Sequence, residues 1–143
     1  MFGSILVPMD ASQTDAGAAA LALAVDVAKI RGGAITVLNV AESIPSFVEA
    51  HIPADVQSRG REQSETIIRD AIAKSGMADG INVVFREGHA ARDILAYARE
   101  NSVDLIVIAS HNPGIADYFL GSVASHVVRH AHCSVLVARN LIS

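Results

Sequence analysis

The stretch SILVPMD at residues 4–10 is a short apolar run that an acidic residue closes. A run of this length and continuity is typical of a strand buried on both faces of a parallel sheet. A second run of the same kind, DLIVIAS, occupies residues 104–110. The two runs predict a pair of central strands, Ser4–Met9 and Asp104–Ser110, around which the rest of the chain is arranged.

Strand and helix patterns alternate between and beyond these two runs. Helices are predicted where apolar residues recur every three or four positions and where glycine follows the last turn. The first helix opens on Ser12–Asp15, which resembles a capping box. In chain order we expect strands at Ser4–Met9, Ala34–Val40, Ile81–Glu87, Asp104–Ser110 and Ser134–Arg139, helices at Ser12–Ile30, Ala54–Ser75, Ala90–Asn101 and Ser122–His130, and loops at Ala41–Pro53 and His111–Leu120. The last helix is expected to bury the face formed by Val123, Ala124, Val127, Val128 and Ala131.

Strict alternation of strands and helices predicts an α/β fold, an open parallel sheet with helices on both faces. In such sheets ligands bind outside the carboxyl ends of the strands, where the strand order reverses. Because Ser4–Met9 and Asp104–Ser110 are the most apolar strands, we expect them to be central, with the reversal between them. No repeat or linker divides the sequence, so we expect one domain over residues 1–143.

Composition excludes several classes of function. The chain of 143 residues is 51% hydrophobic and 4% aromatic with a net charge of −4, so its core is aliphatic and it has no basic surface for nucleic acid or for anionic lipid. No apolar run approaches the roughly 20 residues of a membrane helix. With Cys133 as the one cysteine and no signal-peptide pattern at the N-terminus, we expect a cytoplasmic protein without disulfides.

The residues that follow the two central strands suit a phosphate-bearing ligand. Asp10 is a carboxylate at a strand end, and Ser12 adds a hydroxyl. Gly121 and Ser122 open a helix, whose free N–H groups and dipole favour an anion. The turn signal at residues 112–114, Asn-Pro-Gly, would fold the long loop back over this place. The alternative is purely structural, with the serines as N-caps and Asp10 as a turn residue.

The remaining motifs predict no catalytic residue and no metal site. Neither a P-loop nor a G-x-G-x-x-G fingerprint follows the first strand. His126, His130 and His132 have a spacing that suits a metal, but a solvated helix end explains them as well, so no metal site is predicted. His111 either contacts a phosphate or shapes its loop. Ser122 with His126 lacks a G-x-S-x-G elbow, so no catalytic residue is predicted.

Two stretches resemble a known family. ILVPMDAS at residues 5–12 and LIVIASHNPGIADYFLGSVASHVVRHAHCSVLVAR at residues 105–139 are similar to the first and last parts of the universal stress protein family. The order of elements agrees from end to end. The motifs SHNPG and DYFLGS within the second stretch resemble those of the subgroup that contains the F and G types.

The resemblance implies a Rossmann-like sheet of order 3-2-1-4-5, a homodimer joined through Ser134–Arg139, and a bound adenine nucleotide. That nucleotide is ATP, or AMP or ADP, with Mg²⁺ as an accompanying ion. The family's loop pattern is Gly, two residues, Gly, nine residues, Gly, then Ser or Thr. Gly121 and Ser122 match the end of this pattern, whereas Ala109 and Asn112 replace its first two glycines. Only eight residues, not nine, separate Asn112 from Gly121. Gly114 would take over part of the missing role.

Two more positions carry over from the family. Asp10 matches its ribose-contacting acid, and Val40 matches the position whose backbone contacts the adenine. The expected nucleotide-binding residues are Pro8, Met9, Asp10, Ser12, Val40, Ala109, Ser110, His111, Asn112, Gly114, Gly121, Ser122 and Val123.

Three functions follow from these observations. The first is a nucleotide-binding, dimeric regulatory factor of the stress response, with little or no hydrolysis and with a regulatory protein partner that the sequence does not identify. The second is a dimeric interaction protein of the same fold whose altered loop no longer binds nucleotide. The third is an enzyme, either a slow ATPase or phosphotransferase or an adenylating enzyme, although the SGG-x-DS type of loop of the latter is missing.

Overall fold

The computed structural model of the protein describes residues 1–76, 79–110 and 120–139. Its strands form one five-stranded sheet in the order β3-β2-β1-β4-β5, and every pair of neighbours is parallel. The strands are β1 (Ser4–Pro8), β2 (Ala34–Glu42), β3 (Ile81–Gly88), β4 (Leu105–Ala109) and β5 (Ser134–Ala138). The helices are α1 (Thr14–Arg31), α2 (Ser46–Glu49), α3 (Ala54–Lys74), α4 (Ala90–Glu100) and α5 (Ser122–His130).

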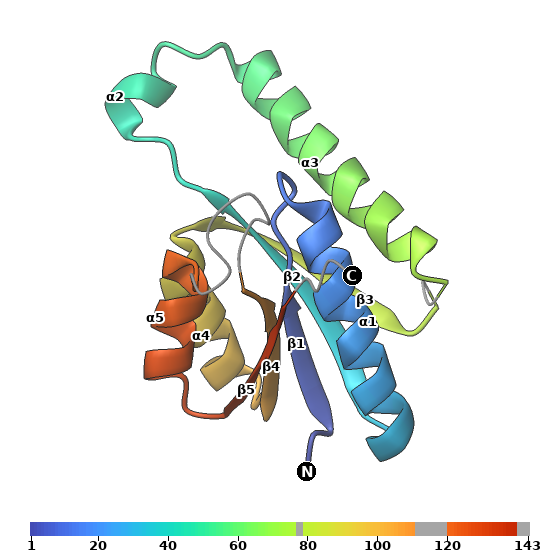
Figure 1. Cartoon of the computed structure of the whole chain (residues 1–143). Coiled ribbons are helices and arrows are strands. Elements are labelled where there is room, and N and C mark those ends of the chain that lie inside the picture. The colour runs from blue at the N-terminus through green and yellow to red at the C-terminus, as the bar shows by residue number, and fades with distance from the viewer. Residues whose placement is uncertain (77–78, 111–119, 140–143) are drawn as a thin grey trace.

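Helices cover both faces of the sheet, α1 and α3 on one side and α4 and α5 on the other (Figure 1). Each side has its own aliphatic core, because the side chains of a strand point alternately to the two faces. On β1, Ile5 and Val7 pack toward α1, whereas Leu6 packs toward α4 and α5. The predicted fold class and strand order are confirmed, and the reversal lies between β1 and β4, where Leu6 pairs with Ile106.

The predicted capping box at the start of α1 is wrong. The N-cap of α1 is Gln13, and no side chain caps it. The Ser12 backbone N–H and hydroxyl instead both donate to Oδ1 of Asp10, at 2.9 and 2.8 Å. Because the Ser12 hydroxyl bonds the turn before the helix, it does not cap the N-terminus of α1 as predicted.

The segment Ala41–Pro53 is more regular than predicted. β2 continues to Glu42, which pairs with Gly88 of β3, and α2 follows as one short helix. The Gln57 side-chain amide donates to the carbonyls of Glu49 and Ile52, at 3.2 and 2.9 Å, and so joins α2 to α3. α2 and the first turns of α3 extend beyond the carboxyl ends of the strands (Figure 1). Such side-chain bonds between segments leave no periodic pattern in the sequence.

The predicted buried face of α5 is correct except at one position. Ala124 and Val127 are buried, and Val123 and Ala131 are half-buried against the same core. Val128 is 45% exposed, because the helical period carries it past the edge of this face.

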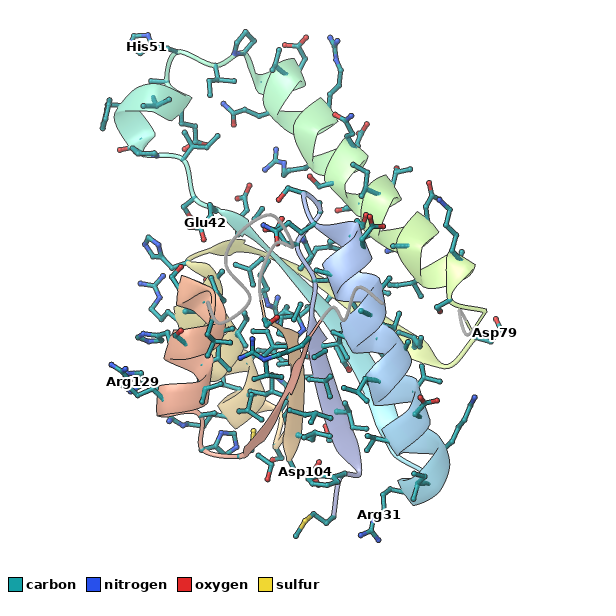
Figure 2. All side chains as sticks on the ribbon, in the orientation of Figure 1. Arg31, Glu42, His51, Asp79, Asp104 and Arg129 are labelled. Carbon is teal, nitrogen blue, oxygen red and sulfur yellow. The ribbon has the colours of Figure 1, made fainter. Side chains whose placement is uncertain are left out.

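Asp104 joins the chain's N-terminus to the amino end of the sheet. Its carboxylate accepts the backbone N–H groups of Gly3 and Ser4, both at 3.1 Å. Loss of hydration opposes the ionised form, but the backbone donors together outweigh it and hold the pKa of Asp104 below its usual value. Figure 2 shows Asp104 at the end of the sheet opposite to Glu42. None of the helices within the described ranges has both the length and the apolarity to cross a membrane.

Candidate functional site

A cavity of about 690 Å³ lies at the carboxyl ends of β1, β2 and β4. This is the place where ligands of open α/β sheets bind. The starts of α1, α4 and α5 and the middle of α3 complete its wall. It is lined by Pro8, Met9, Asp10, Ala11, Ser12, Gln13, Ala16, Gly17, Leu38, Asn39, Val40, Ala41, Glu42, Gln63, Ser64, Ile67, Ala90, Ile94, Ile108, Ala109, Ser110, Gly121, Ser122, Val123 and Ala124.

The turn after β1 presents Asp10 to this cavity. Asp10 is exposed, and its two bonds from Ser12 occupy Oδ1 only. Beneath the turn, the Asn39 amide is 5% exposed and donates to the Met9 carbonyl at 2.9 Å. This bond fixes the last residue before Asp10 to β2, so the carboxylate of Asp10 projects from a supported backbone.

Two backbone bonds place the start of α5 at the same edge. The Ser110 N–H donates to Ala138 of β5 at 3.0 Å, and the Ser110 carbonyl accepts the Gly121 N–H at 2.8 Å. The helix thus begins beside the end of β4, whatever path residues 111–119 take. The Ser125 N–H donates to the Gly121 carbonyl at 2.8 Å, the first bond of the helix.

The N-terminus of α5 is the electropositive part of the wall. No side chain of the described residues caps it, and α5 has no acidic residue in its first turn, whereas α1 and α4 have Asp15 and Asp93 in that turn. The N–H groups of the first turn of a helix have no partner within the helix. Ser122, Val123 and Ala124 line the cavity, so their N–H groups and the helix dipole offer a place for an anion.

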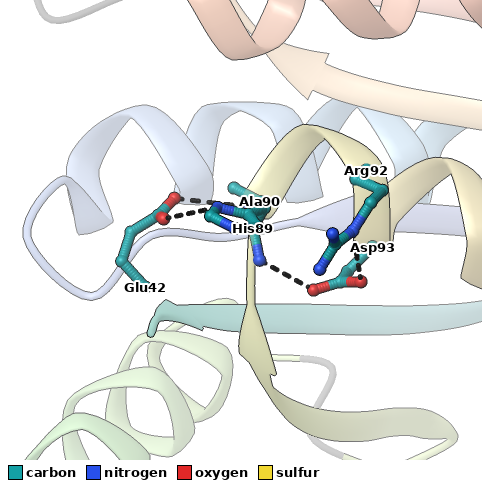
Figure 3. A network of polar contacts seen from close by, with 5 residues as sticks. All are labelled: Glu42, His89, Ala90, Arg92 and Asp93. Atoms are coloured by element: carbon teal, nitrogen blue, oxygen red, sulfur yellow. Dashed lines mark hydrogen bonds and ion pairs between the residues drawn. The ribbon is translucent and has the colours of Figure 1, made fainter. Parts of the chain in front are cut away.

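The N-terminus of α4 is arranged differently (Figure 3). Glu42 accepts the Ala90 N–H at 3.3 Å, and its other oxygen lies 3.8 Å from Nδ1 of His89. Asp93 accepts the His89 N–H at 2.9 Å. Two carboxylates of the protein itself therefore already accept the first two N–H groups of this helix end.

The cavity brings most of the sequence-predicted site residues together. His111, Asn112 and Gly114 lie outside the described residues. All the others line the cavity: Pro8, Met9, Asp10, Ser12, Val40, Ala109, Ser110, Gly121, Ser122 and Val123.

Several lining residues were missed. Asn39 had a signal, because it is the one polar side chain between the apolar residues of the stretch VLNV. Glu42 and Ala90 had none, since the pairing of β2 with β3 is what brings them to the cavity. Gln63 lies on the polar side of α3, where any polar residue would be expected.

No metal centre stands out. The described residues hold no group of three or more His, Cys, Asp or Glu side chains arranged around a metal position. The rings of His126 and His130 lie 4.4 Å apart on α5, away from the cavity lining. Cys133 is half-buried and free, and this burial raises the pKa of its thiol, which makes the thiol less reactive.

The sequence matches the model of the universal stress protein family over residues 1–139. Universal stress protein YxiE of Bacillus subtilis is 29% identical over 151 residues, which cover 97% of this chain and 100% of the relative. Universal stress protein G of Shigella flexneri is 30% identical over 147 residues with the same coverage. The second relative agrees with the predicted similarity to the F and G types.

Solved structures show the same fold. Universal stress protein UspA from Lactobacillus plantarum superposes with a TM-score of 0.78 at 25% identity, covering 96% of this chain and 98% of that chain. A universal stress protein in complex with cAMP has a TM-score of 0.69 at 22% identity and 94% coverage of both chains. With the family model matched over residues 1–139 and relatives similar along their whole length, the chain belongs to the universal stress protein family.

Proposed function

We propose that this protein binds an adenine nucleotide at the carboxyl edge of its sheet and acts as a dimeric regulatory factor of the stress response. The observation that carries the proposal is the uncapped N-terminus of α5, which lines the cavity together with Asp10. The related structure described as a complex with cAMP supports an adenine nucleotide as the ligand class.

Val40 has the backbone geometry to contact the base. The Leu38 carbonyl accepts the Met9 N–H at 2.9 Å, so the backbone groups of Leu38 point toward β1. Residues two apart in a strand point their backbone groups the same way. Val40 therefore presents its N–H and carbonyl to the side of β1, whose pairing with β2 ended at Pro8. We propose that these groups bind the edge of the base.

Asp10 and the start of α5 would hold the rest of the nucleotide. The Asp10 oxygen that Ser12 does not bond suits a ribose hydroxyl, and the first-turn N–H groups of α5 suit a phosphate. Mg²⁺ is held in nucleotide sites by one or two carboxylates together with ligand phosphates. Asp10 and Glu42 both line the cavity and fit this donor set, and the ion would neutralise phosphate charge there.

The described lining favours binding over catalysis. Its carboxylates are Asp10, which accepts two bonds from Ser12, and Glu42, which accepts the Ala90 N–H. A general base must have its acceptor directed at the proton that it removes. Each of these two carboxylates has one oxygen bonded to a donor of the protein itself, and we propose a regulatory rather than an enzymatic role.

A homodimer through β5 is part of the proposal. The two edge strands of the sheet differ in charge. β3 carries Arg86 and Glu87, side chains of the kind that keep edges apart, whereas the residues of β5, SVLVA, include no charge and no proline. Val135 is only half-buried within one chain. We propose that a second copy pairs with this edge.

Ser122→Asp tests the nucleotide site. A carboxylate in the first turn of α5 should stabilise the helix, raising the free energy of unfolding by about 0.5 kcal/mol. The same carboxylate would occupy the phosphate position and repel the ligand, so the Kd for AMP should rise at least about tenfold. Calorimetric titration gives the affinity and urea unfolding gives the stability.

Ser122→Ala is the matched control, since it removes the hydroxyl and leaves the helix end open. It should change the Kd by less than the aspartate does. Equal AMP affinity in Ser122→Asp and the unaltered protein would rule out this phosphate position. No binding of AMP or Mg²⁺-ATP by the unaltered protein at millimolar concentration would instead favour the interaction protein whose loop has lost nucleotide binding.

A further inference from the structure

We propose that the cavity selects its ligand by charge, with Glu42 as the specificity-determining residue. It accepts a nucleoside monophosphate by itself and a nucleoside triphosphate only together with Mg²⁺. This inference rests on the proposed nucleotide site and adds the class of nucleotide that the site takes.

The charges around the cavity have one sign. Among the described lining residues only Asp10 and Glu42 are charged, and none is Lys, Arg or His. Sites that take several phosphates commonly place a Lys or Arg against them. The described lining supplies neither.

Glu42 is held where its charge acts on the ligand. It ends β2, two residues beyond Val40, and its Oε1 accepts the Ala90 N–H at the start of α4 at 3.3 Å (Figure 3). The other Glu42 oxygen lies 3.8 Å from Nδ1 of His89, which is an ion pair only when that imidazole is protonated, and Arg92 lies 3.7 Å from Asp93. The Glu42 carboxylate thus replaces a phosphate at the α4 helix end and leaves its negative charge at the cavity wall.

Among the described helix starts that line the cavity, α5 is the one without an acidic residue in its first turn, and we take it as the phosphate position. The start of α5 has first-turn N–H groups without a capping side chain, whereas Asp93 and Glu42 already accept the donors at the start of α4. A single phosphate can take the α5 donors. Each further phosphoryl group of a triphosphate adds negative charge in a cavity whose described lining already includes two carboxylates, and like charges repel in a partly desolvated site.

Mg²⁺ would change this balance because it neutralises the added charge. It binds through carboxylates and ligand phosphates together, so Asp10 and Glu42 would turn from repelling groups into ligands of the shared ion. The same two residues thus exclude free ATP and admit Mg²⁺-ATP.

Calorimetric titrations with AMP and ATP, each in EDTA and in Mg²⁺, test the inference. They should be run at pH 8 and low salt, where phosphate is fully ionised and screening is weak. In EDTA the unaltered protein should bind AMP at least about tenfold more tightly than ATP. In Mg²⁺ the difference should fall to about threefold or less.

Glu42→Gln isolates the residue, because glutamine keeps an oxygen that can accept the Ala90 N–H while the charge is lost. It should lower the preference for AMP over ATP in EDTA by at least about threefold. Glu49→Gln on α2, outside the cavity lining, is the matched control and should leave the preference unchanged. Circular dichroism confirms that both variants are folded.

Two results would overturn the inference while the proposed function stands. One is equal affinity of the unaltered protein for AMP and for ATP in EDTA, and the other is an unchanged preference in Glu42→Gln. Failure of both AMP and Mg²⁺-ATP to bind would instead overturn the nucleotide site itself, and this inference with it.

Discussion

Asn39 is the residue on which the turn after β1 depends. Its amide is buried among the apolar residues Leu38 and Val40 of β2, and it donates to the carbonyl of Met9. A buried amide needs a partner, and a buried carbonyl needs one too, so each satisfies the other. This pairing holds the backbone just before Asp10, so we propose Asn39 as a positioning residue.

Asn39→Ala should lower the free energy of unfolding by about 2 kcal/mol, since it leaves the Met9 carbonyl without its buried donor. Urea unfolding followed by circular dichroism measures the loss. Asn82→Ala is the control, because Asn82 is exposed on β3 and should change the stability by less than about 0.5 kcal/mol. Equal losses in the two variants would mean that the Asn39 bond contributes nothing.

At the scale of elements, the two edge strands have opposite character. β3 ends in the exposed, charged residues Arg86 and Glu87, whereas β5 is short, uncharged and half-buried. An unpaired, uncharged strand edge is a template for pairing with another chain. The proposed dimer would use the one edge of this sheet that carries no charge.

Val135→Lys places a charge on β5 and should convert a dimer into a monomer, as measured by sedimentation equilibrium. Val135 is half-buried, so retention of the native circular dichroism spectrum must be checked. Asn82→Lys puts the same charge on the opposite edge and should leave the dimer intact. If the dimer persists in Val135→Lys and dissociates in Asn82→Lys, the interface lies at β3 and the prediction is contradicted.

At the scale of the whole molecule, the two ends of the sheet carry their charges for different reasons. Asp104, at the amino end, is an anchor whose carboxylate accepts the Gly3 and Ser4 N–H groups of the chain's first residues. Asp10 and Glu42, at the carboxyl end, line the cavity. Asp104 therefore has a structural role at the amino end of the sheet, whereas Asp10 and Glu42 belong to the candidate site at the carboxyl end.

The lowered pKa of Asp104 predicts how stability depends on pH. A carboxyl whose pKa is lower in the folded state stabilises the fold above its unfolded pKa of about 3.9, and this stability is lost as the pH falls through the folded pKa. Asp104→Asn should therefore cost about 1 kcal/mol at pH 7 and less as the pH falls from 5 to 3. Urea unfolding across this range measures it. A cost that stays constant with pH would contradict the prediction.

Much of the fold could be predicted because the pattern of apolar residues within each strand or helix indicates which of its faces is buried. Apolar runs such as SILVPM have no solvated face, so they must lie inside a parallel sheet. The start of α5 was predicted in the same way, because Gly121 and Ser122 interrupt an irregular stretch before a helical period. The prediction of the helix cap was wrong at Ser12, because its hydroxyl bonds Asp10 and not the helix N-terminus.

The sequence by itself determined the alternating elements, the two aliphatic cores and the places of Asp10 and Ser122 at strand and helix ends. These depend on neighbours in the chain and on periodicity. The tertiary structure alone decided that Glu42 meets Ala90, which lies 48 positions further on, and that Asn39 supports Met9, which lies 30 positions earlier. Such contacts are set by strand register and by the crossing of distant segments, and neither leaves a repeat in the sequence.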